Sequence, residues 1–312
     1  MRKLVFFTSM CVLCGATMVV APARADDIDL NTALQQTYIA CAGIDEGLAD
    51  MKKMAGINTV VTGVGTGLAV GAAVAGFAKA KTDAEIAEME EKLRQMAEEQ
   101  DIDGQYITPG TASTYYATHG EEVMSGSLAS QSAIDEMTAK SKKLGNWRTG
   151  LMAGNTATSV AGAILAAKNR VSEDLQGQVD ECIASVKLLQ RAIAEARMRG
   201  DDVTEAQTIY SACREYEYVD LTPINKRAKG AMISSAVSAV TGGIGTVTSA
   251  MANSDSTRNG DEQKEKNLNS ASNALAVGSG VASAAATVFN ATQIAAIKKV
   301  ASVSEKCTEV LQ

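Results

Sequence analysis

Three glycines spaced two apart, Gly63, Gly65 and Gly67, are the first residues whose type and spacing could do chemistry. A glycine-rich loop that binds a nucleotide phosphate follows a strand and opens a helix, because the helix N-terminus then faces the phosphate. Here small and apolar residues continue at helical spacing through the glycines, with no turn signal and no Gly-Lys-Ser/Thr sequence. We therefore expect no nucleotide site and no bound cofactor.

A short polar segment, 255–261, carries oxygen-bearing side chains at alternate positions, as the calcium loop of a helix–loop–helix motif does. The twelfth position of such a loop needs a bidentate glutamate, but Lys266 stands there. Arg258 adds a positive charge within the loop itself. We interpret the segment as a polar turn and expect no metal site.

His119 is the only histidine of the chain, and no serine, cysteine or carboxylate stands at a spacing that would make it a catalytic base. The adjacent carboxylates Glu90 and Glu91 belong to a charged segment that is typical of a solvated helix face. We therefore predict no catalytic residue. An enzyme with a site in the loop around His119 is a remote alternative.

The first 25 residues have the three parts of an export signal. Arg2 and Lys3 precede an apolar run that ends at Val20, and the small residues Ala23 and Ala25 mark a cleavage site. The sequence thus predicts a cleaved signal peptide over 1–25 and export to the periplasm or cell envelope.

Four cysteines follow the signal peptide, and each falls in a run of apolar residues spaced three and four apart. This spacing places a side chain in the contact between two helices. None has the Cys-x-x-Cys spacing of zinc or thioredoxin-like redox sites. In an oxidising compartment we expect two disulfides, whereas the alternative is four buried free thiols. The four are Cys41, Cys182, Cys213 and Cys307.

Composition favours an all-α chain that does not bind nucleic acid. The net charge is −7, aromatic residues make up 4%, and there are only 3 prolines. A mildly acidic balance gives no electrostatic basis for a nucleic-acid partner. Few β-branched runs alternate with the period of two that a half-buried strand requires.

Four uncharged stretches, 54–78, 149–167, 230–254 and 267–297, are rich in Gly, Ala, Ser and Thr. Small residues recur within them every four positions, a pattern typical of a glycine zipper. At that step we expect the small residues on one helix face, where two backbones approach closely. The predicted packing ladder consists of Gly63, Gly67, Gly71, Ala75, Gly150, Gly154, Thr158, Gly162, Ser234, Ser238, Gly242, Ala274, Gly278 and Ala282.

Two polar segments with Pro-Gly or Asn-Gly turn signals, 101–120 and 253–263, separate these stretches in pairs. We expect a first helical hairpin over 26–200 and a second over 201–312, each with one of these segments as its tip loop. Similar distances from cysteine to small-residue stretch indicate an internal duplication.

Each turn lies midway between two cysteines, so an antiparallel hairpin brings the two cysteines level. The same antiparallel folding about the turn also places the two small-residue stretches of each hairpin at the same level along the axis. The predicted fold is therefore two long antiparallel hairpins that form an elongated, coiled-coil-like four-helix bundle with a close-packed Gly/Ala/Ser-rich middle section. It favours, over the two other connectivities, the pairs Cys41–Cys182 and Cys213–Cys307.

Two functional hypotheses remain open. One is a non-enzymatic, exported scaffold that acts through helix association with a protein partner or with itself. The other is a membrane-embedded or conditionally inserting bundle, a pore or assembly component, because 20–23 residues at ~1.5 Å each span roughly 30–35 Å, close to bilayer thickness. The many hydroxyl residues of 230–252 favour the first.

Overall fold

The described part of the chain is an all-α bundle of long helices, with no strand among the residues described. This confirms the fold class expected from the sequence. The expected signal peptide, 1–25, lies outside the described residues, as do the Pro-Gly and Asn-Gly turn signals. The computed structural model describes residues 29–104, 112–254, 257 and 262–311, with side chains described except in 96–104, 112–130 and at 262.

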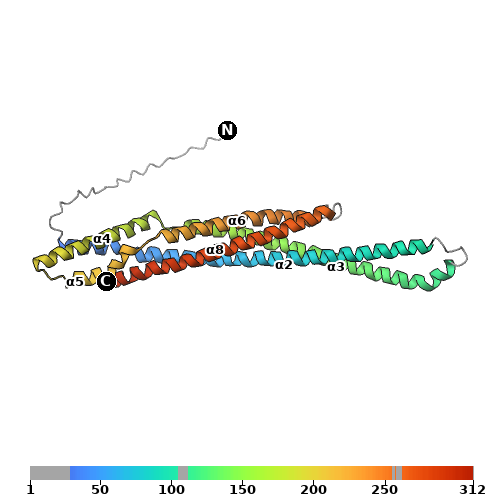
Figure 1. Cartoon of the computed structure of the whole chain (residues 1–312), viewed down its shortest axis with the longest axis horizontal. Helices are drawn as coiled ribbons and strands as arrows, with labels where there is room; N and C mark the ends of the chain where they lie inside the picture. Colours follow the sequence, from blue (N-terminus) through green and yellow to red (C-terminus); the bar gives the residue numbers. More distant parts are fainter. Residues whose placement is uncertain (1–28, 105–111, 255–256, 258–261, 312) are drawn as a thin grey trace, which may run out of the picture.

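The chain runs along the long axis of the molecule four times (Figure 1). The first hairpin ascends through α1 and α2 and returns through α3 and α4. The second ascends through α5, the 3₁₀ helix η1 and α6, and returns through α8. Their bounds are α1 Leu30–Cys41, α2 Ile44–Gly104, α3 Ala112–Lys168, α4 Glu173–Arg199, α5 Thr204–Cys213, η1 Arg214–Tyr218, α6 Thr222–Ala252 and α8 Glu262–Leu311.

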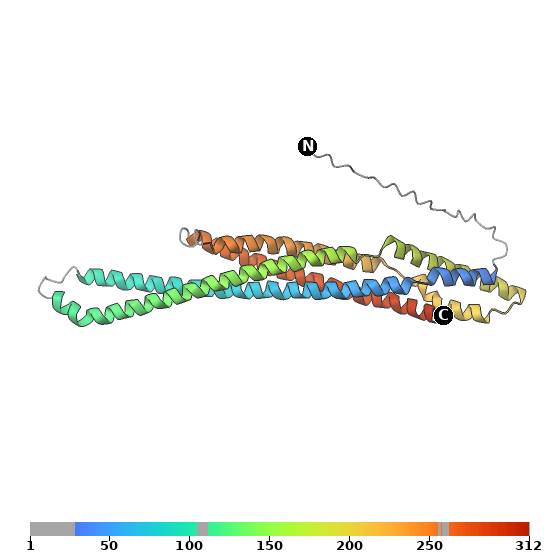
Figure 2. The same cartoon turned by 180° about the vertical axis from the view of Figure 1, so that it is seen from behind.

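The four longest helices form a bundle in which α2 packs on α3 and α8, and α6 packs on the same two helices. The α2–α3 hairpin extends well past the turn between α6 and α8 (Figures 1 and 2). We name three regions along the axis. The slab consists of the four uncharged stretches; the arm consists of 81–104 and 112–143; the head consists of α1, α4, α5, η1 and the adjoining ends of the long helices.

Breaks in the head interrupt helices that the apolar spacing alone would continue. α1 ends at Cys41, and Gly43 turns the chain with φ +86°, a value that favours glycine. Ser172 caps α4, its side chain accepting from the backbone N–H of Leu175, and Gly200 ends α4 at φ +85°. The arm's loop is shorter than the expected 101–120, because α2 continues to Gly104 and α3 begins at Ala112.

Both hairpins have the register that the cysteine midpoints predict. The Sγ–Sγ distances are 2.02 Å for Cys41–Cys182 and 1.98 Å for Cys213–Cys307. Within the first hairpin, a Cβ placed on Gly65 would lie 2.7 Å from Thr158 Oγ1. The glycine therefore permits an approach between α2 and α3 that a side chain at that position would prevent.

Candidate functional site

The interior of the slab consists of polar and small side chains, together with one apolar cluster of Ala72, Met152 and Ala276. Buried positions in α2 continue the spacing of the head's apolar residues, alternating three and four apart, but many carry amides and hydroxyls. The same holds for α3, α6 and α8. Because an unpartnered buried polar group is costly, their hydrogen bonds decide how the helices fit together. Buried polar residues of the slab are Asn58, Thr62, Asn155, Ser159, Ser235, Ser238, Ser249, Asn269, Ser272, Asn273, Ser279, Ser283, Asn290 and Gln293.

A serine cluster fills the centre of the slab and joins three helices. Ser238 Oγ of α6 lies 2.9 Å from Ser159 Oγ of α3 and 2.7 Å from Ser283 Oγ of α8. Asn155 Nδ2 donates to Ser279 Oγ at 2.6 Å. Since α3 belongs to the first hairpin and α6 and α8 to the second, these hydroxyls hold the hairpins in register with each other.

Amides join α2 and α8 nearer the head. Asn58 Nδ2 donates to Asn290 Oδ1 at 2.9 Å, and both residues are fully buried. Gln293 Nε2 donates to the backbone carbonyl of Asn169 at 2.8 Å. The two hairpins are thus connected by side-chain hydrogen bonds along the slab, whereas each disulfide lies within one hairpin.

Arg148 lies fully buried at the arm-side edge of the slab. Its guanidinium donates to Ser249 Oγ at 2.9 Å, to Asn273 Oδ1 at 3.0 Å and to Asn269 Oδ1 at 2.7 Å. One α3 side chain therefore binds groups on both helices of the second hairpin.

Lys79, also fully buried, is the second cation of this edge. Its Nζ lies 2.6 Å from Asp83 Oδ2 and 3.0 Å from Glu265 Oε1, and Ser141 Oγ donates to the other Asp83 oxygen. The buried ammonium is thus paired with two carboxylates. Such pairing is the condition under which a charge can be buried inside a helical bundle.

The outer surface of the slab is apolar. Most exposed large hydrophobic side chains of the described residues lie there, and the exposed fractions reach 67% at Val60 and Val281. The slab therefore has polar side chains inside and aliphatic side chains outside. The outward residues, of which only Trp147 lies just outside the uncharged stretches, are Ile57, Val60, Val64, Val70, Val74, Phe77, Trp147, Val160, Ile164, Ile233, Val237, Val240, Ile244, Val247, Met251, Val277, Val281, Val288 and Phe289.

The predicted small-residue ladder does not stay on one face. Gly162, Ser238 and Gly242 are buried, and a Cβ on Gly242 would lie 2.8 Å from Thr156 Oγ1. A Cβ at four other positions would meet no atom within 4 Å: Gly63, Gly67, Gly150 and Gly278. A strict step of four advances about 40° around the helix each time, because four residues exceed one turn of 3.6. The remaining members, Gly71, Ala75, Gly154, Thr158, Ser234 and Ala282, are partly buried, and Ala274 is exposed.

The head has the opposite arrangement, with an apolar core that surrounds both disulfides. Leu48, Val186 and Ile224 are fully buried there. Tyr216 is also fully buried, and this burial raises the pKa of its hydroxyl to about 12. Each disulfide therefore lies in a core of the kind found in water-soluble domains.

The described residues contain no cluster of three or more His, Cys, Asp or Glu that could hold a metal ion. The backbone of His119 lies in α3, but its side chain falls outside the described residues. Asp255, Arg258 and Asn259, from the segment that resembles a calcium loop, also lie outside the described residues. Continuing the head's apolar spacing beyond Ala55 would have identified Asn58, Thr62 and Lys79 as interior residues.

Comparisons with protein-family models, with curated proteins and with solved structures gave no match. A functional assignment therefore rests on the distribution of polar and apolar side chains described above. Four helical regions of the described chain are long and apolar enough to cross a membrane, by length and composition. They are Leu30–Gln95, Gln131–Arg199, Thr222–Ala252 and Gln263–Leu311.

Proposed function

We propose that this chain is a membrane-spanning scaffold of the cell envelope, in which α2, α3, α6 and α8 cross the bilayer together as the slab. It acts by helix association and by presenting a head and an arm on opposite sides of the membrane, not by catalysis. The observation that carries the proposal is the inverted slab, polar inside and apolar outside. Of the two hypotheses open at the sequence level, it favours the membrane-embedded bundle.

The outer surface supports a lipid environment. Outward aliphatic residues occur on all four helices, and the exposed fractions of Val74, Val240 and Val247 are 62%, 62% and 60%. Contiguous exposed apolar surface of this extent marks a membrane or protein contact, because water would hydrate it at a cost of about 25 cal/mol per Å². Lipid removes that cost on every side of the bundle at once.

The interior supports the same environment. Lipid offers no hydrophobic drive for helices to associate, so membrane helices associate through close packing and polar contacts between side chains. The serine cluster and the Asn58–Asn290 hydrogen bond are contacts of this kind. Arg148 and Lys79 face the interior with partners, as charged residues in membrane bundles do. The hydroxyls of 230–252 that favoured a soluble rod include Ser235, Ser238 and Ser249, which are buried.

The length and edges of the slab fit a bilayer. At ~1.5 Å per residue, 149–167 and the helical residues 230–252 extend over about 28 and 34 Å, which brackets the hydrocarbon thickness of about 30 Å. Trp147 and Phe77 lie exposed at the arm-side edge, where interfacial aromatic residues are enriched in membrane proteins. Basic residues flank both edges, so they set no orientation across the membrane: Lys52, Lys53, Lys168, Arg170, Lys226, Arg227, Lys229, Lys298 and Lys299 lie at the head side, and Lys81, Lys140, Lys142 and Lys143 at the arm side.

The disulfides support one orientation. If all four helices cross the bilayer, both disulfides lie on one side and the arm on the other. Since disulfides persist in oxidising compartments, the head faces that compartment. The arm faces the opposite aqueous phase, where exposed ion pairs such as Lys92–Glu88 at 2.7 Å are well solvated. The arm is therefore the region that we assign to a protein partner.

The test is alkaline carbonate extraction of membranes from cells that express the full chain, with flotation of the purified protein in phospholipid vesicles. We expect the protein to stay in the membrane pellet and to float with the vesicles. Protease added from one side should cut either the arm or the head, but not both. Release into the soluble fraction without flotation would contradict the proposal.

A further inference from the structure

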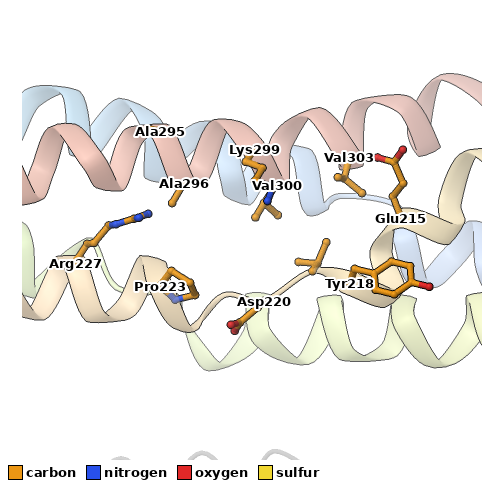
Figure 3. Close-up of a pocket in the computed structure, with 11 residues that line it drawn as sticks. Glu215, Tyr218, Asp220, Pro223, Arg227, Ala295, Ala296, Lys299, Val300 and Val303 are labelled. Carbon is orange, nitrogen blue, oxygen red and sulfur yellow. The ribbon is translucent and has the colours of Figure 1, made fainter.

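A groove in the surface of the second hairpin lies at the head-side edge of the slab (Figure 3). Its cavity volume is about 520 Å³. One wall comes from η1 and the first turns of α6, just before the uncharged stretch 230–254 begins. The other wall comes from α8, where the uncharged stretch 267–297 ends. The groove therefore lies at the level where the slab meets the head.

The groove has an apolar floor. Val300 is 7% exposed, and Val219, Pro223 and Val303 are partly buried beside it. These side chains continue the apolar surface of the slab toward the head. A ligand with an apolar part that lies against the slab can therefore extend into the groove without leaving apolar contact.

The charges around the groove are ordered along the molecular axis. Arg227 projects from α6 at the slab end, whereas Lys299 of the facing α8 lies further toward the head, on the wall opposite Asp220 (Figure 3). Glu215 follows toward the head. Among the residues the structure describes, neither Arg227 nor Lys299 has a carboxylate at ion-pair distance.

Asp220 remains negatively charged at neutral pH. Thr222 donates its hydroxyl and backbone N–H to Asp220, and these hydrogen bonds lower the pKa of the carboxyl. Glu215 lies 3.3 Å from Lys306 Nζ on the side toward the head. A ligand in the groove thus meets Arg227 first, then Lys299 and Asp220 on opposite walls, and Glu215 last as it extends away from the slab.

We propose that the groove binds the headgroup of a phospholipid that carries a primary ammonium group, with the phosphate at Arg227 and Lys299 and the ammonium at Asp220. This inference rests on the proposed membrane function, because it places the groove at the headgroup level. A phospholipid of the ethanolamine class presents phosphate next to its glycerol and ammonium beyond it, and Arg227 and Asp220 lie along the groove in that order. Its ammonium donates hydrogen bonds to carboxylates, which a quaternary choline cannot do.

The probe is a mixture of phosphatidylcholine, phosphatidylethanolamine and phosphatidylglycerol added to the full chain in detergent, with retained lipids counted by native mass spectrometry. We expect wild type to retain phosphatidylethanolamine preferentially. The double variant R227Q/K299Q should lose about tenfold in retention of that lipid, since each removed group made a charge-assisted contact with phosphate. The matched control K52Q/K53Q, at the same edge but outside the groove, should retain it as wild type does.

The D220N variant separates the ammonium contact from the phosphate contact. The asparagine Oδ1 can still accept from the backbone N–H of Thr222, as Asp220 Oδ1 does at 2.8 Å, so the fold is kept. We expect D220N to retain ethanolamine and choline lipids equally. Wild type that shows no lipid preference, R227Q/K299Q that binds as tightly as wild type, or preferential retention of phosphatidylglycerol would each overturn the headgroup proposal.

Flotation distinguishes the two proposals. A protein that floats with vesicles but shows no preference for the ethanolamine lipid contradicts the groove assignment alone. A protein that does not float contradicts the membrane function, and with it the basis for placing the groove at lipid headgroups.

Discussion

The head and the slab belong to the same four-pass bundle, yet they distribute polarity in opposite ways. In the head, Leu48 and Ile224 are fully buried, and charged residues such as Lys306 and Glu215 lie outside. In the slab, serines and asparagines are buried and valines are outside. Both regions include parts of the same long helices, and their buried positions have the same alternating spacing of three and four residues. Secondary structure alone therefore does not account for the difference.

The difference shows that helix packing and environment are set by separate features of the sequence. The alternating spacing of three and four determines which positions face inward in both regions. Which side chains occupy the inward and outward positions determines the solvent in which each region is stable. A single helix such as α2 therefore passes from a region with an apolar core into a region whose buried positions are largely polar or small and whose exposed positions are aliphatic.

The largest expected effect lies in the head core. Leu48→Ala should destabilise the head by about 2–5 kcal/mol, because it leaves a cavity among fully buried apolar neighbours. Chemical denaturation of the full chain in detergent, read by protease resistance of head peptides, measures the change. Leu48→Met is the matched control and should cost less than about 1.5 kcal/mol. Equal effects of the two would show that the head is loosely packed.

On the outer surface of the slab, no cavity forms when a side chain is changed, and we expect the introduction of a charged side chain to be costly. Val240→Asp places a carboxylate near the middle of the outward face of α6, at an expected cost of about 2.5–3.5 kcal/mol if that face meets lipid. The fraction resistant to carbonate extraction measures it. Val310→Asp, at an exposed head position, is the control and should change nothing. Identical behaviour of both variants would mean that water surrounds the slab.

The head should lose stability at high pH through Tyr216. Its pKa is raised to about 12 by burial, so the neutral hydroxyl stabilises the folded state fully below pH 10, and this contribution is lost as pH rises through about 12. Two units correspond to about 2–3 kcal/mol. Between about pH 9 and 12, the free energy of unfolding of the head should fall less steeply with pH in Tyr216→Phe than in wild type. If the variant and wild type show the same dependence of unfolding free energy on pH, groups other than Tyr216 cause the loss of stability.

The smallest effect is expected in the polar centre of the slab. Ser238→Ala removes hydrogen bonds to Ser159 and Ser283, and contacts of this kind in membrane bundles average about 0.6 kcal/mol. The free energy of unfolding in mixed micelles measures it. Ser302→Ala, on the exposed surface of α8, is the control. A loss of several kcal/mol at Ser238 would indicate that the slab interior behaves as a water-soluble core does.

Much of the fold could be predicted from local signals. The positions of Cys41 and Cys182 about a central turn were enough to place the ascending and returning helices of the first hairpin in register. The break after Cys41 could not be predicted in the same way, because apolar spacing continues through it. Gly43 ends the helix there by adopting a positive φ that only the folded backbone reveals.

The polar interior was harder to predict, for a physical reason. Arg148 finds its acceptors at Asn269 and Asn273, more than a hundred residues along the chain, so no local pattern identifies them. The step-of-four ladder was also misleading, since it winds around the helix. Its outward members Gly67 and Gly278 are separated from the packing surface that it was expected to mark.

The most direct test of the proposed slab uses Trp147, the only tryptophan of the chain, which is 60% exposed at the arm-side edge. Its fluorescence in reconstituted vesicles would be measured with lipids brominated either near the headgroup end or near the methyl end of the acyl chains, and with aqueous iodide. If the slab spans the bilayer, we expect the strongest quenching by bromine near the headgroup and weak quenching by iodide. Full quenching by iodide, with none by either lipid, would contradict it.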